Sequence, residues 1–136
     1  MNTDLDQFIE VAESELLNQI TEQIIGCAFK VANTLGCGFL EKVYENALAH
    51  ELRKLNLQVE QQKPIEVLYD GIVVGVYVPD LWVENLVPVE LKATKGIDDV
   101  HLAQLLNELK ASRSKLGLLL NFGTPKIGIR RVVNSY

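Results

Sequence analysis

The sequence contains little cysteine or histidine, the residues that hold most zinc and redox sites. Its two cysteines, Cys27 and Cys37, lie ten positions apart, and its two histidines are His50 and His101. This spacing is not the C-x-x-C pattern of zinc and thiol redox motifs, and the histidines do not complete a zinc ligand set. We therefore expect no zinc site, and we expect both cysteines to be small core residues of a protein in a reducing compartment.

The sequence also lacks an excess of basic residues and any long apolar run. It has 13 Lys and Arg against 18 Asp and Glu, so the formal net charge is −5. Binding nucleic acid over a broad surface needs many Lys and Arg contacts to phosphate, so any such contact must be local or metal-assisted. The N-terminus is acidic, and no stretch approaches the roughly 20 apolar residues that cross a bilayer. We expect no membrane association and a cytoplasmic location.

What the chain does have is enough apolar content for one core. It has 136 residues, 48% of them hydrophobic, which predicts a single domain over 1–136 with a flexible N-terminal segment over 1–12. Apolar residues recur at steps of three and four over 13–34 and again over 40–55. These patterns predict two helices, separated at Gly36 and Gly38, that form an α-hairpin.

After residue 56 the pattern favours strands. Segments 57–69, 72–83 and 86–93 are rich in β-branched and aromatic residues, and the turn signals Asp70-Gly71 and Glu84-Asn85 lie between them. This predicts an antiparallel meander of three strands. A helix over 98–112, with Asp98 or Asp99 as N-cap, leads to a buried strand over 115–123 and an edge strand. The predicted fold class is α/β or α+β in layers, with the order α-α-β-β-β-α-β and a short final β element.

Two charged residues interrupt the apolar stretch 87–93, "VPVELKA". Side chains two apart in a strand share a face, so Glu90 and Lys92 project together. Folding the preceding strand back at Glu84-Asn85 places Asp80 opposite Glu90, with Cβ atoms roughly 4.5 to 5.5 Å apart. Two carboxylates this close repel each other unless one carries a proton or a cation lies between them.

A divalent ion is the simplest way to satisfy this pair of acids. Asp80, Glu90 and the backbone carbonyl of Leu91 are hard oxygen ligands that suit Mg²⁺ or Mn²⁺. Lys92 would then orient, or help to deprotonate, a water molecule that attacks a phosphate. The arrangement suits phosphodiester hydrolysis. The same spacing also allows a structural salt bridge between Lys92 and the acids, with no catalytic role.

The spacing of these residues resembles a known motif. Pro79-Asp80 followed by "ELK" at 90–92 is similar to the PD-(D/E)XK motif of the restriction-endonuclease-like superfamily. The resemblance extends over about residues 20–133. It implies a restriction-endonuclease-like core and a nuclease acting on DNA or RNA. It also implies that Asp80 and Glu90 are metal ligands and that Lys92 is the catalytic lysine.

A second stretch, "GFLEKVY", narrows the resemblance. It places Gly38, Glu41 and Tyr44 at the spacing that names the GxxExxY family of this superfamily. Family similarity implies that Glu41 contributes to the metal site, directly or through a water molecule. It also implies a site role for Gln104, which resembles a glutamine on the helix after the core motif.

Each of these residues also has a structural interpretation. Glu41 near a helix start is favoured by the helix dipole, Tyr44 suits a helix core, and Gln104 suits a structural hydrogen bond. The chain departs from the family pattern at Ala32, where the family often has histidine. It departs again at Glu108, where a tyrosine is common.

Three classes of function remain open. The first is an Mg²⁺- or Mn²⁺-dependent nuclease. The second is a catalytically inactive nuclease-fold module that binds a protein or nucleic-acid partner. The small size and acidic balance favour it, and pairing as a homodimer would enlarge its surface. A small-molecule enzyme comes third, because "GCG" at 36–38 lies between two helices, the wrong context for a dinucleotide-binding loop.

Overall fold

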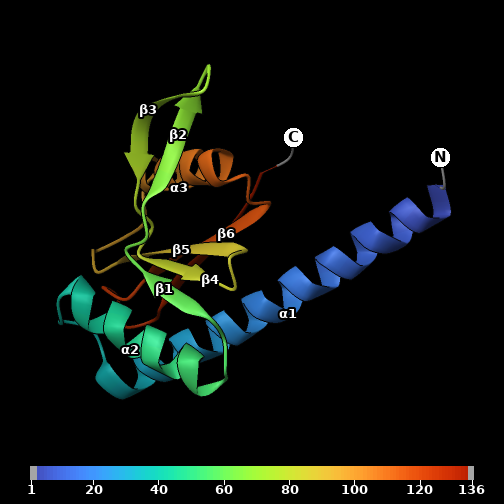
Figure 1. Ribbon diagram of the computed structural model, residues 1–136. Helices are drawn as coiled ribbons and strands as arrows, with labels where there is room; N and C mark the ends of the chain where they lie inside the picture. The colour runs from blue at the N-terminus through green and yellow to red at the C-terminus, as the bar shows by residue number, and fades with distance from the viewer. Residues whose placement is uncertain (1–2, 135–136) are drawn as a thin grey trace.

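The computed structural model describes residues 3–134, which form helices on both faces of a β-sheet (Figure 1). The helices are α1 (Thr3–Leu35), α2 (Glu41–Lys54) and α3 (Asp99–Ser112). The strands are β1 (Val59–Gln61), β2 (Ile65–Tyr69), β3 (Ile72–Tyr77), β4 (Leu81–Val83), β5 (Val87–Lys92), β6 (Leu116–Asn121) and β7 (Gly128–Val133). α1 and α2 cover one face of the main sheet, and α3 lies on the other.

The main sheet contains five strands in the order β1-β4-β5-β6-β7. Neighbouring strands run antiparallel except β5 and β6, which are parallel. A parallel pair needs a long crossover connection, and α3 supplies it. The predicted class, a layered fold of mixed α and β elements, is confirmed.

The first two predicted strands are each broken in two, which is a correction to the three-strand meander. Segment 57–69 becomes β1 and β2, and segment 72–83 becomes β3 and β4. Pro64 and Pro79 lie in the two breaks and have no N–H for a ladder, and Gln62 has a left-handed φ of 56°. β2 and β3 therefore leave the main sheet as a separate hairpin that stands out past α3 (Figure 1).

Both predicted turns occur at the expected residues. Asp70 and Gly71, with φ of 56° and 76°, join β2 to β3. Glu84 and Asn85, with φ of 53° and 54°, follow β4 and lead into β5. Gly, Asn and Asp adopt this left-handed backbone most readily, which is why such pairs mark hairpins. The β4–β5 hairpin fixes the register of the candidate site.

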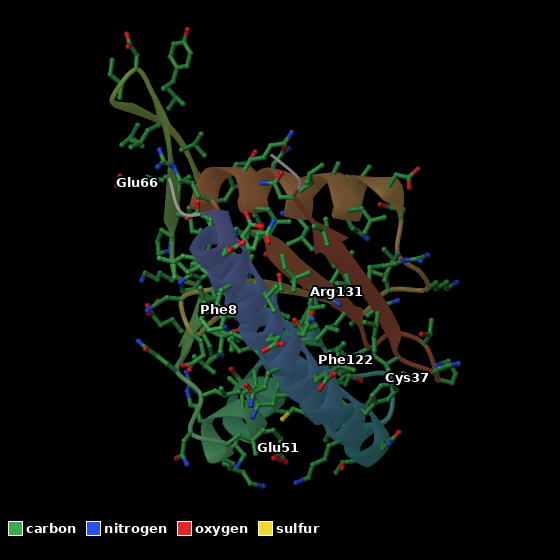
Figure 2. The ribbon with its side chains drawn as sticks, turned by 90° about the vertical axis from the view of Figure 1, so that its right-hand side faces the viewer. Phe8, Cys37, Glu51, Glu66, Phe122 and Arg131 are labelled. Atoms are coloured by element: carbon green, nitrogen blue, oxygen red, sulfur yellow. The ribbon has the colours of Figure 1, made fainter. Side chains whose placement is uncertain are left out.

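The helix α1 starts earlier than expected. It begins at Thr3, so residues 3–12 of the segment expected to be flexible are helical, and residues 1 and 2 lie outside the described residues. Residues 4–16 are all exposed, whereas Ile20 and Ile24 are buried against the sheet and α2. Only the C-terminal half of α1 packs on the body. In Figure 2 the N-terminal half, which carries the labelled Phe8, projects toward the viewer.

Cys27 is buried as expected, but Cys37 is exposed. The expectation of two core thiols was wrong for Cys37 because this residue lies in the loop between α1 and α2, outside the apolar stripe of either helix. Within residues 3–134, no helix combines the length and apolar character needed to span a bilayer.

The main core lies between the sheet and the layer formed by α1 and α2. In β5, Val89 and Leu91 are 0% and 1% exposed and belong to one apolar cluster with Leu118 of β6. Successive side chains of a strand point to opposite faces, so Glu90 faces α3 instead. Its neighbour across the β5–β6 ladder, Leu119, is buried outside this cluster. An otherwise apolar strand thus carries one buried acid on its α3 face.

Candidate active site

The register of β4 and β5 brings Asp80 and Glu90 together. The β4–β5 ladder ends with the pair of Leu81 and Val89, so Asp80 and Glu90 occupy the next positions just beyond it. Directly opposed residues of an antiparallel pair project to the same face of the sheet. The structure therefore places the two carboxylates side by side, as the spacing of the turn predicts.

The Asp80 carboxylate is held by two donors. Its Oδ2 accepts a hydrogen bond of 2.7 Å from the Leu91 N–H, and its Oδ1 accepts one of 3.1 Å from the Gln62 side-chain amide. The Gln62 N–H also donates to the Asp80 carbonyl, at 3.1 Å. Asp80 is therefore fixed in one orientation before any ligand arrives.

The backbone carbonyl of Leu91 lies at the same edge. The N–H and C=O of a strand residue point toward the same neighbouring strand, so the Leu91 carbonyl is directed, like its N–H, toward Asp80. Two places further along the β4–β5 register, the residue opposite Leu91 is Pro79, which has no N–H to donate. The proline of the motif therefore offers the Leu91 carbonyl no N–H donor.

Glu90 is not alone beneath α3, because Glu108 lies against it. Glu90 is 5% exposed and Glu108 is 0% exposed. Neither Glu90 Oε1 nor either carboxyl oxygen of Glu108 has a hydrogen-bond donor among residues 3–134. A proton on either residue would let the two carboxyl groups bond to each other. Glu108 appears in the sequence only as a departure from the family pattern, and the structure makes it part of the acidic site.

Burial is the main reason that these acids resist ionisation. It raises the pKa of Glu90 from 4.5 to about 11, and the neighbouring carboxyl group of Glu108 and the negative charge of Asp80 add to the rise. Burial also raises the pKa of Glu108, while the positive charge of Lys92 opposes the rise. In the metal-free site Glu90 therefore keeps its proton at neutral pH.

Lys92 lies beside the two acids, but its side chain forms no ion pair with either. It follows Glu90 by two residues in β5, shares its face and is half-buried. The Lys92 ammonium group makes no hydrogen bond or ion pair with another residue in the described part of the chain. The structural salt bridge that the spacing allowed is not formed, so the ammonium group remains available to a ligand.

Tyr44 and Gly38 shape the loop before α2. Tyr44 is 0% exposed, and its hydroxyl donates to the Gly36 carbonyl at 2.6 Å and accepts from the Phe39 N–H at 3.2 Å. Its ring stacks on Phe122 at a centroid distance of 4.7 Å. Gly38 has a φ of 115°, which a residue with a side chain rarely adopts. The structure therefore favours the structural interpretation of this part of the GxxExxY pattern.

Glu41, in contrast, is exposed in the first turn of α2, and its carboxylate makes no hydrogen bond or ion pair within residues 3–134. One turn later, Glu45 is 3% exposed and accepts a bond of 2.7 Å from the Gln62 amide. The same amide nitrogen donates to Asp80, so Gln62 links α2 to the site. Sequence reasoning missed Glu45 and Gln62. The only signal for Glu45 was its position four residues after Glu41.

Gln104 also lies apart from the acids. It is exposed on α3, one turn before Glu108, and its side-chain amide has no hydrogen-bond partner in the described chain. Residues four apart share a helix face, so the two side chains are neighbours along α3. Gln104 therefore borders the acidic patch from the solvent side.

The donors at this site are the kind that Mg²⁺ and Mn²⁺ prefer, although no three acidic, histidine or cysteine side chains within 3–134 are arranged to hold an ion. Asp80, Glu90 and the Leu91 carbonyl offer two carboxylates and one backbone oxygen. The buried Glu90 Oε1 has no donor, and a cation would satisfy it. The residues present fit a hard divalent ion that keeps several of its waters.

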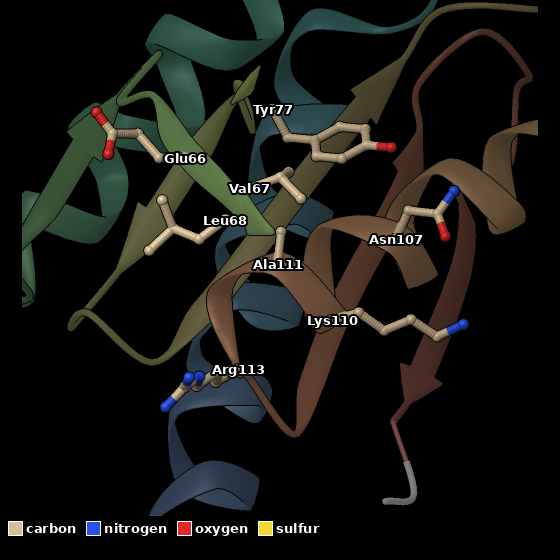
Figure 3. A pocket seen from close by; sticks show the side chains of 8 residues that line it. All are labelled: Glu66, Val67, Leu68, Tyr77, Asn107, Lys110, Ala111 and Arg113. Atoms are coloured by element: carbon tan, nitrogen blue, oxygen red, sulfur yellow. The ribbon is translucent and has the colours of Figure 1, made fainter. Parts of the chain in front are cut away.

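A hollow on the molecule lies elsewhere. It has a volume of about 440 Å³ and lies between the β2–β3 hairpin and α3 (Figure 3). Eight residues line it: Glu66, Val67, Leu68, Tyr77, Asn107, Lys110, Ala111 and Arg113. Neither Asp80, Glu90 nor Lys92 is among them, so this hollow and the acidic patch are different features.

Similarity to known proteins covers most of the chain. A family model described as the PD-(D/E)XK nuclease superfamily matches residues 18–132. No curated protein is significantly similar. A solved structure described as "Crystal structure of SSO0001" is 19% identical, with a TM-score of 0.52, over 70% of this chain and 50% of that chain. This chain therefore spans about half the length of that one, and at this identity the likeness shows the fold alone.

Proposed function

The chain belongs to the PD-(D/E)XK nuclease superfamily, and we propose that it is an Mg²⁺- or Mn²⁺-dependent nuclease that hydrolyses phosphodiester bonds of DNA or RNA. The observation that carries the proposal is the pairing of Asp80 with Glu90, whose buried Oε1 lacks a donor. Lys92, without an ion-pair partner in 3–134, projects beside them. Opposed acids with an unpaired lysine suit metal-assisted hydrolysis better than they suit a structural role.

Asp80, Glu90 and the Leu91 carbonyl are the residues that would hold the ion. When bound, it supplies charge to stabilise the phosphate and acidity to a water molecule. The Leu91 N–H and the Gln62 amide keep the Asp80 carboxylate in place, as supporting donors do at metal sites. Glu108 would act behind Glu90, where it holds that carboxyl group against the sheet.

Lys92 is the residue that we assign to the water and the phosphate. Its Nζ can donate a hydrogen bond to a phosphate oxygen or to the attacking water, and so position them for reaction. The family resemblance implies site roles for Glu41 and Gln104. In this proposal both act from the border of the site and are not its main ligands. Both are exposed and make no competing bond within residues 3–134.

A calorimetric titration of metal-free protein with Mn²⁺ tests the metal site. We expect binding to the wild type, and binding weaker by about tenfold or more in Asp80→Asn and Glu90→Gln. Glu66→Gln is the matched control, because it neutralises an exposed acid on the hairpin. Full affinity in Asp80→Asn, or no binding by the wild type, would contradict the proposed site.

Cleavage needs a separate assay with single- and double-stranded DNA and RNA. Lys92→Met should retain Mn²⁺ binding and lose cleavage, since it removes the donor but not the ligands. If wild type and Lys92→Met cleave at the same rate, Lys92 is not part of the machinery.

One observation favours the alternative, an inactive module that binds a protein or nucleic acid. Glu90 lies almost fully buried beneath Glu108, and none of the described hollows includes Asp80, Glu90 or Lys92. A site that stays closed would not admit a phosphate. Absence of metal binding, together with an unchanged phenotype for Lys92→Met, would favour this reading.

A further inference from the structure

The N-terminal half of α1 presents an exposed apolar stripe. Phe8, Val11 and Leu16 are 70%, 56% and 47% exposed, and with Ala12 they recur at steps of three, one and four. Residues at such steps share a helix face. Contiguous apolar surface of this kind on a protein usually marks a contact with another molecule.

This stripe cannot fold back onto its own chain. α1 is one continuous helix whose later residues are buried in the core, so its first turns follow the direction that those residues set. Glu13 forms an ion pair of 2.8 Å with Lys115, and Asn18 accepts a hydrogen bond from Arg131. The stretch 4–12 extends beyond these anchors by about 14 Å, at about 1.5 Å per residue.

The hollow between the hairpin and α3 is a receptor of suitable size for an aromatic side chain. Its volume is about 440 Å³. Val67, Tyr77 and Ala111 provide apolar surface, and Lys110 and Arg113 lie toward one side (Figure 3). A groove that mixes apolar and basic side chains suits an amphipathic helix whose apolar anchor is flanked by acids.

The charges of the helix and the groove are complementary. The chain has no Lys or Arg before Lys30, and Asp4 and Glu15 lie on the same helix face as Phe8. The groove carries Lys110 and Arg113 against the single acid Glu66. Opposite charges around an apolar anchor favour association and fix its orientation.

The positions of helix and groove allow two copies to exchange helices. Arg113 lines the groove and also lines a second hollow with Leu16 and Leu17, where α1 leaves the body. The departure point of α1 and the groove therefore meet at the C-terminal end of α3. A two-fold axis near this point brings the helix of each copy to the groove of the other.

We propose that a second copy of this chain occupies the groove, with residues 4–12 of each copy docked between the hairpin and α3 of its partner and Phe8 inserted as the anchor. The exchange forms two equivalent contacts, which doubles the buried area toward the roughly 1,600 Å² of a typical stable interface. The proposal is independent of the nuclease activity, because none of these residues belongs to the acidic site.

The mass in solution gives the first test. Sedimentation equilibrium should give twice the 15.2 kDa of one chain for the wild type. Phe8→Glu and Ala111→Glu should each give the mass of one chain, because they place a charge in the apolar contact. Val43→Glu is the matched control, since it changes an exposed apolar residue of α2 and should leave the dimer intact. A monomeric wild type at every concentration, or a dimer that survives Phe8→Glu, would overturn the proposal.

Disulfide trapping shows which elements meet. In a Cys37→Ser background, which removes the exposed native thiol, Phe8→Cys and Ala111→Cys proteins are purified separately, mixed and oxidised. A covalent dimer that joins positions 8 and 111 in the mixture supports the exchange. Failure of that cross-link, or a Phe8→Cys protein that links only to itself, would overturn the proposed docking, the latter in favour of helix-to-helix pairing.

Discussion

The two faces of strand β5 bury opposite kinds of side chain. On one face, Val89 and Leu91 pack into the apolar cluster formed with α1 and α2. On the other, Glu90 lies beside Glu108, and no donor in 3–134 reaches three of their carboxyl oxygens. Burial of apolar surface stabilises a fold, whereas burial of an acid without a partner destabilises it. A single strand therefore contributes both to the stability of the fold and to a locally unfavourable site.

The contrast indicates that the face of β5 that carries Glu90 serves function. A protein that only needed a stable sheet would place a leucine or valine at position 90, as it does at 89 and 91. Acids that are buried without partners persist where a ligand satisfies them, and displaced pKa values gather at such sites. Substitutions on each face should therefore change stability in opposite directions.

The largest effect is expected on the apolar face. Leu118→Ala removes a side chain that is 0% exposed within the main cluster. The lost burial and the resulting cavity should lower the free energy of unfolding by about 2–5 kcal/mol. Urea denaturation measures this loss, which should be the same with and without Mn²⁺. A loss below about 1 kcal/mol would show that this face is less tightly packed than the structure indicates.

On the opposite face, neutralising the acid should have the opposite sign. Glu90→Gln keeps the shape of the side chain and removes the cost of protonating, on folding, an acid that is ionised in the unfolded chain. We expect the metal-free protein to gain about 1–3 kcal/mol in unfolding free energy at pH 8. The same substitution should remove the stabilisation that Mn²⁺ gives to the wild type, which thermal unfolding detects. A less stable metal-free variant would mean that Glu90 is ionised and satisfied in the fold.

The acidic face should also make stability depend on pH. The pKa of Glu90 is about 11 in the folded protein against an ordinary 4.5. Between these values the folded state binds a proton that the unfolded state releases, so the free energy of unfolding falls as pH rises. The contribution is complete below pH 4.5 and is lost as pH rises through about 11, with a slope near 1.4 kcal/mol per pH unit. Urea titrations of metal-free protein from pH 6 to 9 should show this slope, and Glu90→Gln should flatten it.

A smaller effect is expected from the residue that orients Asp80. Gln62→Ala removes the amide that links Glu45 to Asp80 and leaves both acids in place. Mn²⁺ affinity should fall by roughly tenfold, as is common for supporting groups at metal sites. Gln58→Ala, a few residues earlier and also exposed, is the control. Equal affinity in the two variants would show that the Leu91 N–H alone is enough to position Asp80.

Much of the site was predictable because it depends on local rules. The left-handed turn at Glu84-Asn85 and the alternation of side chains in a strand together place Asp80 opposite Glu90. The layered fold followed from the order of apolar patterns. The breaks near Pro64 and Pro79 were not predicted, since β-branched residues continue across them and only the tertiary structure decides where the ladder ends.

Contacts between residues of different elements could not be predicted from local sequence patterns. Glu108 joins Glu90 only because α3 packs over the sheet, and Glu45 joins Asp80 only through Gln62. Neither relation leaves a spacing in the sequence that distinguishes it from chance. For Tyr44 the sequence pattern was clear but did not indicate a site role. Its hydroxyl bonds to Gly36 and Phe39 and so stabilises the loop before α2.

Anomalous scattering of Mn²⁺ in crystals of this protein tests the proposed metal site most directly. We predict a peak in contact with the carboxylates of Asp80 and Glu90 and with the Leu91 carbonyl, and a Glu90 carboxyl turned away from Glu108 toward the ion. Crystals that bind Mn²⁺ only at other positions, with Glu90 still directed toward Glu108, would contradict the assignment of these acids as a metal site.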